Sequence, residues 1–259
     1  MAINNRPVIL ITGVSGGIGQ ATSRVFLTAG WTVVGTVRTP AKRRGGIDLQ
    51  PAEMTRHADL TRVMAHIDRT YGRLDALVCN AGYGLVGPLE TLGYAQMRDQ
   101  LAVNVLAPAE LTRLALPLLE RSGGAAVGVS SIVGLTGLAG YSVYAASKHA
   151  LEGLYESLAL EYADTTVRFK LIEPSGVNTG FWTALKRGKP QAGEGGAART
   201  YSGQDHGLTP ESVAAEIYRA VTDRSVRLRY PLGQTARLML ARRLLPESLV
   251  RRALRRFTN

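Results

Sequence analysis

The chain has 259 residues, of which 45% are hydrophobic and 20% are charged, and its formal net charge is +11. This composition is typical of a folded domain with a sizeable core. It excludes a disordered chain, a collagen-like chain and a protein with many membrane spans. Ten arginines and one acid, Glu247, lie between positions 224 and 259, so the remainder is nearly neutral. We therefore expect no nucleic-acid partner, because the basic charge is confined to one end.

One cysteine, Cys79, and four histidines are present. A lone cysteine excludes an internal disulfide, and the scattered histidines offer no metal-ligand cluster, so we expect no bound metal. The first residues lack the basic region and apolar core of a signal peptide. These features favour a cytoplasmic location.

Short β-branched segments alternate with longer segments of helical periodicity. Strands are predicted at residues 8–12, 31–37, 53–58, 74–80, 125–131, 167–173 and 226–232. Helices are predicted at residues 17–30, 60–71, 94–121, 141–163 and 209–223. This alternation predicts an α/β fold of the Rossmann type, a doubly wound parallel sheet of about seven strands with helices on both faces.

No internal repeat or linker divides the chain, so we expect one dinucleotide-binding and catalytic domain over residues 1–233. A glycine-rich stretch within residues 179–208 is predicted to be a substrate loop, because long loops in compact domains are usually functional. Residues 234–259 are predicted to form a basic amphipathic helical extension of the same domain, broken at Pro246.

A glycine-rich turn, Thr-Gly-Val-Ser-Gly-Gly-Ile-Gly at residues 12–19, joins the first predicted strand to the first predicted helix. Gly13 permits a tight turn, while Gly17 and Gly19 let the backbone approach a pyrophosphate and let the helix pack on the sheet. The helix N-terminus then offers N–H groups and a positive dipole to the phosphates. The pattern alone also fits an ordinary tight turn, but its strand–turn–helix context favours a dinucleotide.

Three polar side chains form a candidate catalytic group. Tyr144 and Lys148 are four residues apart on a predicted helix and therefore share one face. Ser131 ends a predicted strand at the carboxyl edge of the sheet, where doubly wound folds bind ligands. A phenol can protonate a carbonyl oxygen during hydride transfer, a nearby ammonium lowers the phenol pKa, and a serine hydroxyl polarises the carbonyl. Ser130 is the nearest rival to Ser131.

The glycine turn resembles that of the short-chain dehydrogenase/reductase family, and further motifs in the same order extend the resemblance over nearly the whole chain. These motifs are Asp59, Cys-Asn-Ala-Gly at 79–82, Asn104, Ser131, Tyr144, Lys148 and Pro-Ser-Gly-Val-Asn-Thr at 174–179. The spacing of 13 residues between Ser131 and Tyr144 also matches. Cys79 and Ser175 depart from the commonest residues, asparagine and glycine. Cys79 is expected to be a buried small residue, and Ser175 puts the local loop geometry in doubt.

The resemblance implies a role for each matching residue. Asn104, Ser131, Tyr144 and Lys148 would form the catalytic tetrad, with Asn104 supporting a water-linked proton path to Lys148 and Lys148 also holding the nicotinamide ribose. Asp59 would cap the adenine pocket, and Thr179 would hold the carboxamide. The expected coenzyme-binding residues are Thr12, Gly13, Ser15, Gly17, Ile18, Gly19, Arg38, Asp59, Leu60, Asn80, Ala81, Gly82, Tyr144, Lys148, Pro174, Gly176, Val177 and Thr179.

The second predicted strand indicates which coenzyme is used. Enzymes specific for NAD place an acid at its end, where the carboxylate binds the ribose 2′-hydroxyl. Here Arg38 follows the strand, and a guanidinium can bind a 2′-phosphate through its planar fork. We therefore expect NADP(H) as the coenzyme, although a solvated basic loop would give the same pattern.

Residues 78–90 and 146–158 resemble hydroxysteroid and retinol dehydrogenases, which implies a lipophilic alcohol or carbonyl substrate. The predicted apolar pocket consists of Leu85, Val86, Leu138, Tyr141, Phe181 and Trp182. Three alternatives stay open: a promiscuous reductase of small ketones or aldehydes, a dinucleotide-binding sensor without activity, and an epimerase or dehydratase. The complete tetrad disfavours the sensor, and the chain length disfavours the epimerase.

The last predicted helix is amphipathic. Leu249, Val250, Ala253, Leu254 and Phe257 fall on one face, and four arginines fall on the other. Such a helix suits peripheral contact with an anionic membrane, or packing of its apolar face on the body or on a partner subunit. The family resemblance also implies a homo-oligomer, a dimer or tetramer.

Overall fold

The computed structural model describes residues 6–39, 45–188 and 207–258. Its centre is a seven-stranded sheet in the order β3-β2-β1-β4-β6-β7-β9, and every neighbouring pair is parallel. The strands are β1 (Val8–Ile11), β2 (Thr32–Val37), β3 (Asp48–Pro51), β4 (Ala76–Cys79), β6 (Ala125–Val129), β7 (Arg168–Pro174) and β9 (Arg229–Leu232). The predicted Rossmann-type sheet is confirmed.

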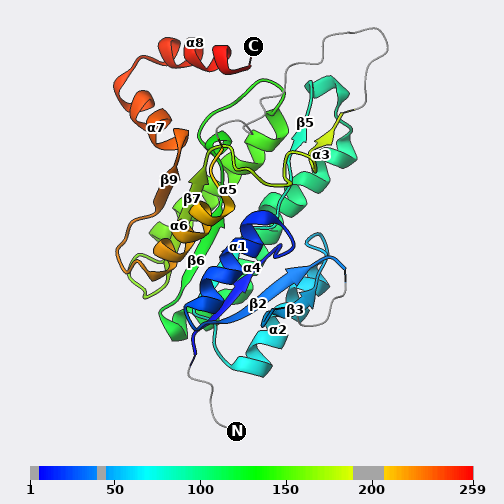
Figure 1. Cartoon of the computed structure of the whole chain (residues 1–259), viewed down its shortest axis with the longest axis vertical. Coiled ribbons are helices and arrows are strands. Elements are labelled where there is room, and N and C mark those ends of the chain that lie inside the picture. The colour runs from blue at the N-terminus through cyan, green and yellow to red at the C-terminus, as the bar shows by residue number, and fades with distance from the viewer. Residues whose placement is uncertain (1–5, 40–44, 189–206, 259) are drawn as a thin grey trace.

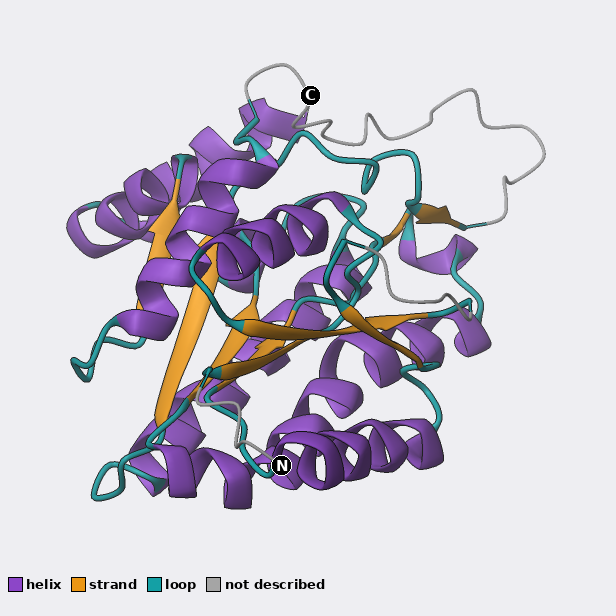
Figure 2. Cartoon of the chain, turned by 60° about the horizontal axis from the view of Figure 1, so that its bottom comes forward, coloured by secondary structure: helices purple, strands orange, loops and turns teal. Residues whose placement is uncertain are grey.

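Helices cover both faces of the sheet (Figures 1 and 2). Helices α1 (Gly17–Thr28) and α6 (Pro210–Thr222) pack on one face, where Phe26 and Ile217 join the apolar side chains of the central strands. Helices α2 (His57–Tyr71), α4 (Ala107–Ser122) and α5 (Ser142–Glu161) cover the other face. Because β1, β4 and β6 are buried on both faces, their sequences are continuous apolar runs rather than alternating ones.

A continuous helical segment precedes β6. It consists of α3 (Tyr94–Leu101), a π-helical turn (Ala102–Leu106) and α4. By length and composition this segment would be long enough to cross a membrane. However, its buried side chains, among them Leu111 and Ala115, pack on the sheet as those of a core helix do. It therefore acts as one of the covering layers.

Two sequence predictions about strands were wrong. The strand expected at residues 53–58 lies instead at β3, whose sequence Asp-Leu-Gln-Pro is extended because it pairs with β2. A second, two-stranded sheet was not expected at all. In it β5 (Leu85–Val86) pairs with β8 (Lys186–Arg187), and β8 lies inside the predicted substrate loop. Residues 189–206 of that loop lie outside the described residues.

The other elements lie near the carboxyl ends of the strands or extend from them. Short 3-10 turns span Leu89–Thr91 and Ile132–Gly134. Helices α7 (Gln234–Leu244) and α8 (Glu247–Thr258) follow β9 and are separated at Pro246, as predicted. An Arg242 guanidinium on α7 donates to the carbonyl of Leu135, so the C-terminal extension contacts the loop that follows β6.

Candidate active site

The glycine turn between β1 and α1 has little space for side chains. Gly13 has a φ of 71°, in the left-handed region that favours glycine. A Cβ on Gly19 would lie 2.3 Å from the carbonyl oxygen of Gly13, and a Cβ on Gly17 would lie 2.8 Å from Thr179. No side chain caps the N-terminus of α1. Its first N–H groups and its dipole therefore suit a pyrophosphate, which is the fit that a dinucleotide requires.

The ends of β1 and β4 are tied together beside this turn. The Thr12 hydroxyl accepts hydrogen bonds from the backbone N–H groups of Asn80 and Ala81, each at 2.9 Å. The Asn80 amide donates in return to the carbonyl of Thr12 at 2.8 Å and to that of Gly13 at 3.3 Å. The structure thus places these four expected residues together, and their own contacts fix the turn.

Ser15 and Arg38 are both exposed, Ser15 in the glycine turn and Arg38 just after β2. Within the described ranges Arg38 makes no hydrogen bond or ion pair, so its guanidinium is available to a ligand. Val14, next to Ser15, donates its backbone N–H to Thr36 of β2, which brings the turn and the strand end together. This arrangement suits a phosphate near Arg38.

Asp59 and Leu60 lie in the first turn of α2. The Asp59 carboxylate accepts from the Glu53 backbone N–H at 2.9 Å and from Arg62 at 2.8 Å, and these bonds lower its pKa, the bond from Arg62 most strongly. Leu60 is buried in the core. Neither residue lines the pocket that contains Ser131, Tyr144 and Lys148. Their predicted role at an adenine stays a prediction.

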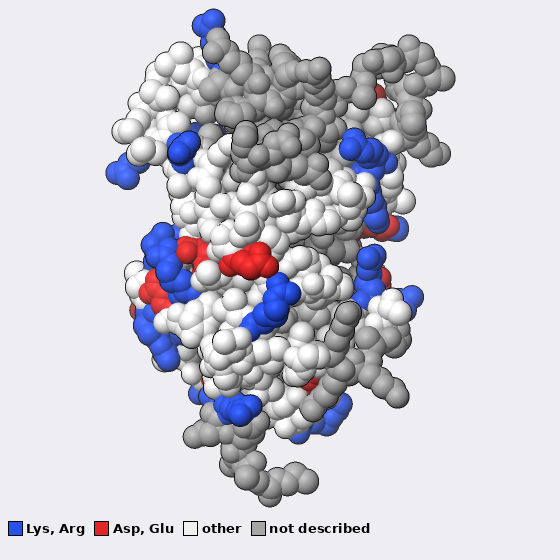
Figure 3. Space-filling model, viewed as in Figure 1, with Lys and Arg blue, Asp and Glu red and all other residues white. Residues whose placement is uncertain are grey.

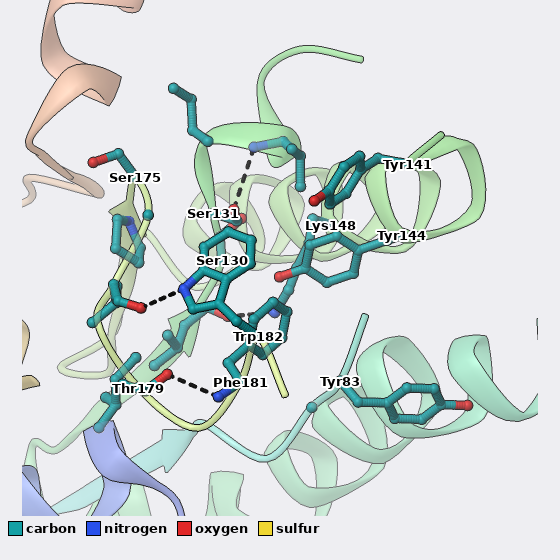
Figure 4. A pocket seen from close by; sticks show the side chains of 18 of the residues that line it. Tyr83, Ser130, Ser131, Tyr141, Tyr144, Lys148, Ser175, Thr179, Phe181 and Trp182 are labelled. Atoms are coloured by element: carbon teal, nitrogen blue, oxygen red, sulfur yellow. Dashed lines mark hydrogen bonds between the residues drawn. The ribbon is translucent and has the colours of Figure 1, made fainter. Parts of the chain in front are cut away.

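Ser131, Tyr144 and Lys148 meet in one pocket (Figure 4). Ser131 lies two residues beyond β6, at the start of a 3-10 turn, where its hydroxyl accepts from the N–H of Val133. Tyr144 and Lys148 share a face of α5, and the Lys148 ammonium lies 5.9 Å from the centroid of the Tyr144 ring. The predicted catalytic group is thus brought together by the end of one strand and one helix.

The pKa of Tyr144 is raised above its ordinary value, chiefly by burial, while a hydrogen bond with Ser131 opposes this rise. The net pKa is thus raised in the protein alone, and the lowering by Lys148 that the sequence analysis expects stays a prediction. Lys148 donates to the Val129 carbonyl at 2.7 Å, and burial lowers its own pKa to about 8. Tyr144 is therefore a protonated phenol at neutral pH, which is the form that can donate a proton.

Asn104 is buried in the π-helical turn between α3 and α4. Its amide donates to the Tyr83 carbonyl and to the Ser147 hydroxyl, each at 3.0 Å, and its oxygen accepts from the Tyr83 N–H. A Cβ on Gly82 would lie 3.0 Å from the Asn104 oxygen and 3.9 Å from the Lys148 ammonium. Asn104 and Lys148 thus flank Gly82, without a direct hydrogen bond between them. π-helical turns often occur at functional sites.

The pocket encloses about 780 Å³, part of it open to solvent. Ten of the expected residues line it: Ile18, Asn80, Gly82, Ser131, Tyr144, Lys148, Pro174, Gly176, Val177 and Thr179. One wall is apolar and aromatic. Phe181 lies 5.8 Å from Tyr144 and 5.6 Å from Trp182 between ring centroids, and the Trp182 indole donates to the Val177 carbonyl. Figure 4 shows Phe181 and Trp182 opposite Tyr141 and Tyr144.

Of the six residues expected to form the substrate wall, Leu138, Tyr141, Phe181 and Trp182 line the pocket. Leu85 and Val86 do not, and that expectation was wrong. They form β5 and are fully buried in apolar clusters beneath the pocket. An apolar sequence pattern marks burial, and it does not distinguish a core position from a pocket wall.

Several residues that the sequence analysis does not single out also line the pocket: Tyr83, Val129, Ile132 and Val133. Ser130, the rival to Ser131, is buried there with its hydroxyl unpaired among the described residues. All of these residues lie close in sequence to Asn80–Gly82 or to Ser131, and only this adjacency could have predicted them as lining residues.

The two residues that depart from the family pattern are both accommodated. Cys79 is buried, as expected, and burial raises the pKa of its thiol to about 11, so it is inert. The Ser175 hydroxyl accepts from the backbone N–H of Gln234, which links the loop after β7 to the start of α7. In the described part of the chain, no group of His, Cys, Asp and Glu side chains has the arrangement of a metal site.

Two curated proteins are similar over most or much of this chain. The 3-ketodihydrosphingosine reductase of Bacteroides thetaiotaomicron is 28% identical over 261 residues, 96% of this chain and 97% of that protein. Human 17-beta-hydroxysteroid dehydrogenase type 1 is 39% identical over 197 residues, 68% of this chain and 58% of that protein. This chain therefore resembles two proteins named for ketone or alcohol oxidoreduction.

Two solved structures share the fold. A short-chain dehydrogenase from Streptomyces avermitilis has a TM-score of 0.83 and 31% identity, and the match covers 98% of this chain and 96% of that one. A metagenomic short-chain oxidoreductase in complex with NADP has a TM-score of 0.70 and 27% identity, covering 87% and 96%. The family model described as short chain dehydrogenase matches residues 7–190, well over half of the chain. This chain therefore belongs to the short-chain dehydrogenase family of oxidoreductases.

Proposed function

We propose that this chain is an NADP(H)-dependent oxidoreductase that interconverts an alcohol and its ketone or aldehyde, with a lipophilic substrate. One observation carries the proposal. A protonated Tyr144 phenol, the Ser131 hydroxyl and the Lys148 ammonium line one pocket, together with Ile18 from the N-terminal turn of α1. A proton donor and a carbonyl-polarising group therefore lie beside the dinucleotide-binding turn.

Each polar side chain has a task in carbonyl reduction. The bound nicotinamide supplies the hydride in reduction and accepts it in alcohol oxidation. Ser131 donates a hydrogen bond to the substrate oxygen and stabilises the negative charge that develops there. Tyr144 donates its phenolic proton to that oxygen. Lys148, as an ammonium, stabilises the phenolate that remains. In alcohol oxidation the same groups act in reverse.

Two observations support NADP(H) rather than NAD(H). Arg38 is exposed beyond β2 and has no partner among the described residues, whereas a carboxylate at this point would repel a 2′-phosphate. A structural neighbour of the same family was solved with NADP. We assign the 2′-phosphate contact to Arg38.

The lipophilic substrate is inferred from the pocket wall. Leu138, Tyr141, Phe181 and Trp182 present apolar and aromatic surface to the pocket. Such a wall buries a large apolar ligand and orients it through a single polar function. Two relatives are named for a long-chain ketone and for a steroid. The alternative is a promiscuous reductase of small carbonyls, which the same wall would bind more weakly because they bury less apolar area.

The proposal is tested by following the absorbance of reduced nicotinamide with a panel of steroid, retinal, long-chain, aryl and small aliphatic carbonyls. NADPH and NADH are compared, and Tyr144→Phe is the control. We expect turnover that prefers NADPH, increases with the apolar area of the substrate and falls by about 10²–10⁴-fold in Tyr144→Phe, the range that general acid catalysis contributes.

Two results would count against the proposal. Preference for NADH would contradict the assignment of Arg38. Full activity of Tyr144→Phe would contradict the role of the phenol. If the folded protein binds NADPH and turns over none of the panel, the sensor without activity becomes the better interpretation.

A further inference from the structure

A cluster of charged residues lies one helical turn beyond Lys148 on α5. Arg229 of β9 donates to the Glu173 carboxylate at 2.7 Å and also to the Glu152 carboxylate, while its second terminal nitrogen reaches Glu156 at 3.3 Å. The side chains of Glu173 and Glu152 are 0% and 6% exposed, and that of Arg229 is 25% exposed. Two buried acids therefore share one partly buried base.

The hydrogen bonds of the two acids are incomplete. Oε1 of Glu152 and Oε2 of Glu173 are buried and find no partner among the described residues. Two adjacent buried carboxylates repel each other, and Arg229 bonds only one oxygen of each. A proton held between the two acids would remove one negative charge and add a donor for an unpaired oxygen.

This pair lies next to the catalytic lysine. Lys148 and Glu152 are four residues apart on α5, so they occupy the same helical face, and the Glu152 charge favours the ammonium form of Lys148. The other titratable groups around Lys148 are Tyr144 on the same helix and the thiol of Cys79 on β4, and neither is charged at neutral pH. Glu152 is therefore the nearby acid that can balance Lys148.

We propose that Glu152 and Glu173 share one proton behind the active site, and that loss of this proton supplies the negative charge that keeps Lys148 cationic above neutral pH. With the proton bound, the pair and Arg229 are together neutral. When the proton passes to solvent, the pair and Arg229 carry one net negative charge, which balances the Lys148 ammonium. Glu152 and Glu173 are positioning residues in this scheme, because they act on Lys148 and do not touch the substrate.

The pKa values of Glu173 and Lys148 agree with this order of proton loss. Burial and the neighbouring Glu152 charge raise the pKa of Glu173 to about 7, against the opposing effect of Arg229. Burial lowers the pKa of Lys148 to about 8, and Glu152 opposes that shift. The shared proton is thus lost at a lower pH than the Lys148 proton.

The shared proton is tested on the protein without coenzyme by infrared spectroscopy across neutral pH. We expect one carbonyl-stretch band of a protonated carboxylic acid that disappears as the pH rises through about 7. The band should be absent from Glu173→Gln and Glu152→Gln. It should remain in Glu156→Gln, a matched control on the same helix that also contacts Arg229 but is 58% exposed. No carboxylic acid band in the wild-type protein would overturn the shared proton.

The effect on Lys148 is measured by NMR of isotope-labelled lysine, again without coenzyme. The chain has five lysines, so the Lys148 signal is assigned by its loss in Lys148→Met. Removing the opposite charge of Glu152 should lower the Lys148 pKa by about one unit in Glu152→Gln. Glu156→Gln should leave it unchanged. An unchanged Lys148 pKa in a folded Glu152→Gln would overturn the positioning role, and Glu173→Gln serves as the second variant if Glu152→Gln does not fold.

The consequence for catalysis rests on the proposed function. In carbonyl reduction the alkaline limb of the pH profile of kcat should move to lower pH by about the same amount in Glu152→Gln. A shifted Lys148 pKa with an unmoved kcat profile would overturn the catalytic part of the proposal. Absence of turnover in every variant and in the wild type would count against the proposed function, while the infrared and NMR results would still decide the shared proton.

Discussion

At the scale of single residues, the candidate site depends on how burial changes ionisation. Tyr144 is nearly fully buried, so desolvation favours its neutral phenol over the phenolate. Lys148 is equally buried. The Val129 carbonyl accepts a hydrogen bond from its ammonium, and the Glu152 charge favours the protonated form. Burial therefore keeps the Tyr144 phenol protonated, and it makes the pKa of Lys148 depend on neighbouring charges.

Arg38→Ala tests the coenzyme assignment. Loss of a charge-assisted contact to a 2′-phosphate costs about 1.5–3 kcal/mol, so kcat/KM for NADPH should fall at least about tenfold. The value for NADH should stay unchanged, because NADH lacks that phosphate. Steady-state kinetics with both coenzymes measure the effect. Arg24→Ala, which removes an exposed arginine on α1, is the control and should alter neither value. An equal loss for both coenzymes would show that Arg38 acts on the fold rather than on the phosphate.

The sequence predicts which candidate catalytic residues lie together, because their chemistry requires particular side chains at fixed separations. Tyr144 and Lys148 lie one helical turn apart, and Ser131 is placed by the end of a strand. Arg229 could not have been predicted, since it joins Glu152 and Glu173 across 77 and 56 residues of sequence. Such a contact follows from strand order, which a single sequence does not report. The net pKa of Tyr144 also depends on burial, which only the packed structure reveals.

At the scale of elements, β5 pairs with β8 near the beginning of the predicted substrate loop. The pairing of Leu85 with Lys186 places the Phe181–Trp182 segment over the pocket. Close contacts accompany it, because a Cβ on Gly188 would lie 2.0 Å from the Thr91 hydroxyl and 2.9 Å from the Thr91 carbonyl. The loop is thus held by backbone pairing and by small residues.

Gly188→Ala should therefore displace the loop and spare the coenzyme site. We expect KM for a lipophilic substrate to rise several-fold, whereas the affinity for NADPH, followed by fluorescence, should stay unchanged. Gly137→Ala is the matched control, because a Cβ there meets nothing within 4 Å. If both variants bind and turn over substrate like the wild type, the β5–β8 pairing does not position the loop.

The acid pair between α5, β7 and β9 also makes a prediction about stability. The folded protein binds the Glu173 proton more tightly than the unfolded chain, because the pKa rises from 4.5 to about 7. This contribution to stability is complete below the unfolded pKa and is lost as the pH rises through about 7. Glu173→Gln mimics the protonated acid at every pH. The difference between its Tm and the wild-type Tm should therefore increase by a few degrees from acidic to neutral pH. About 1 kcal/mol shifts Tm by roughly 2–4 °C for a protein of this size.

Thermal unfolding over a series of pH values measures this difference, with Glu156→Gln as the exposed control. A Tm difference that does not change with pH would show that folding does not raise the pKa of Glu173.

The strands predicted from long apolar runs are present in the structure. The prediction failed for strands that are extended only because they pair with a neighbouring strand. The strands β1, β4 and β6 can be predicted from their apolar composition alone. In contrast, β3 is polar and ends in Pro51, and it is a strand because β2 lies beside it. The two residues each of β5 and β8 are likewise defined by their partner. Local sequence therefore determines the core strands, and tertiary contacts determine the edges.

At the scale of the whole molecule, charge and apolar surface are unevenly distributed. Basic side chains are spread over the body on the face in Figure 3, with acids among them. The C-terminal extension combines most of the excess arginine with exposed leucines. Leu240, Leu244, Leu245 and Leu249 are 59%, 68%, 48% and 51% exposed. Val250 of the predicted apolar face is buried instead, and several other side chains of α8 lie outside the described residues. Exposed apolar and basic side chains together are typical of peripheral membrane binding.

We therefore predict that the protein sediments with vesicles containing an anionic phospholipid and is released by high salt, because screening weakens the attraction of the arginines. Vesicles of a zwitterionic lipid alone should bind it less. Leu240→Ser combined with Leu244→Ser should weaken binding, since both leucines would enter the interface. Leu160→Ser, which alters an equally exposed leucine at the end of α5, should leave binding unchanged. If anionic vesicles bind nothing at low salt, the exposed leucines of α7 are better explained by a partner subunit. In that case, analytical ultracentrifugation of the double variant should show a loss of the oligomer.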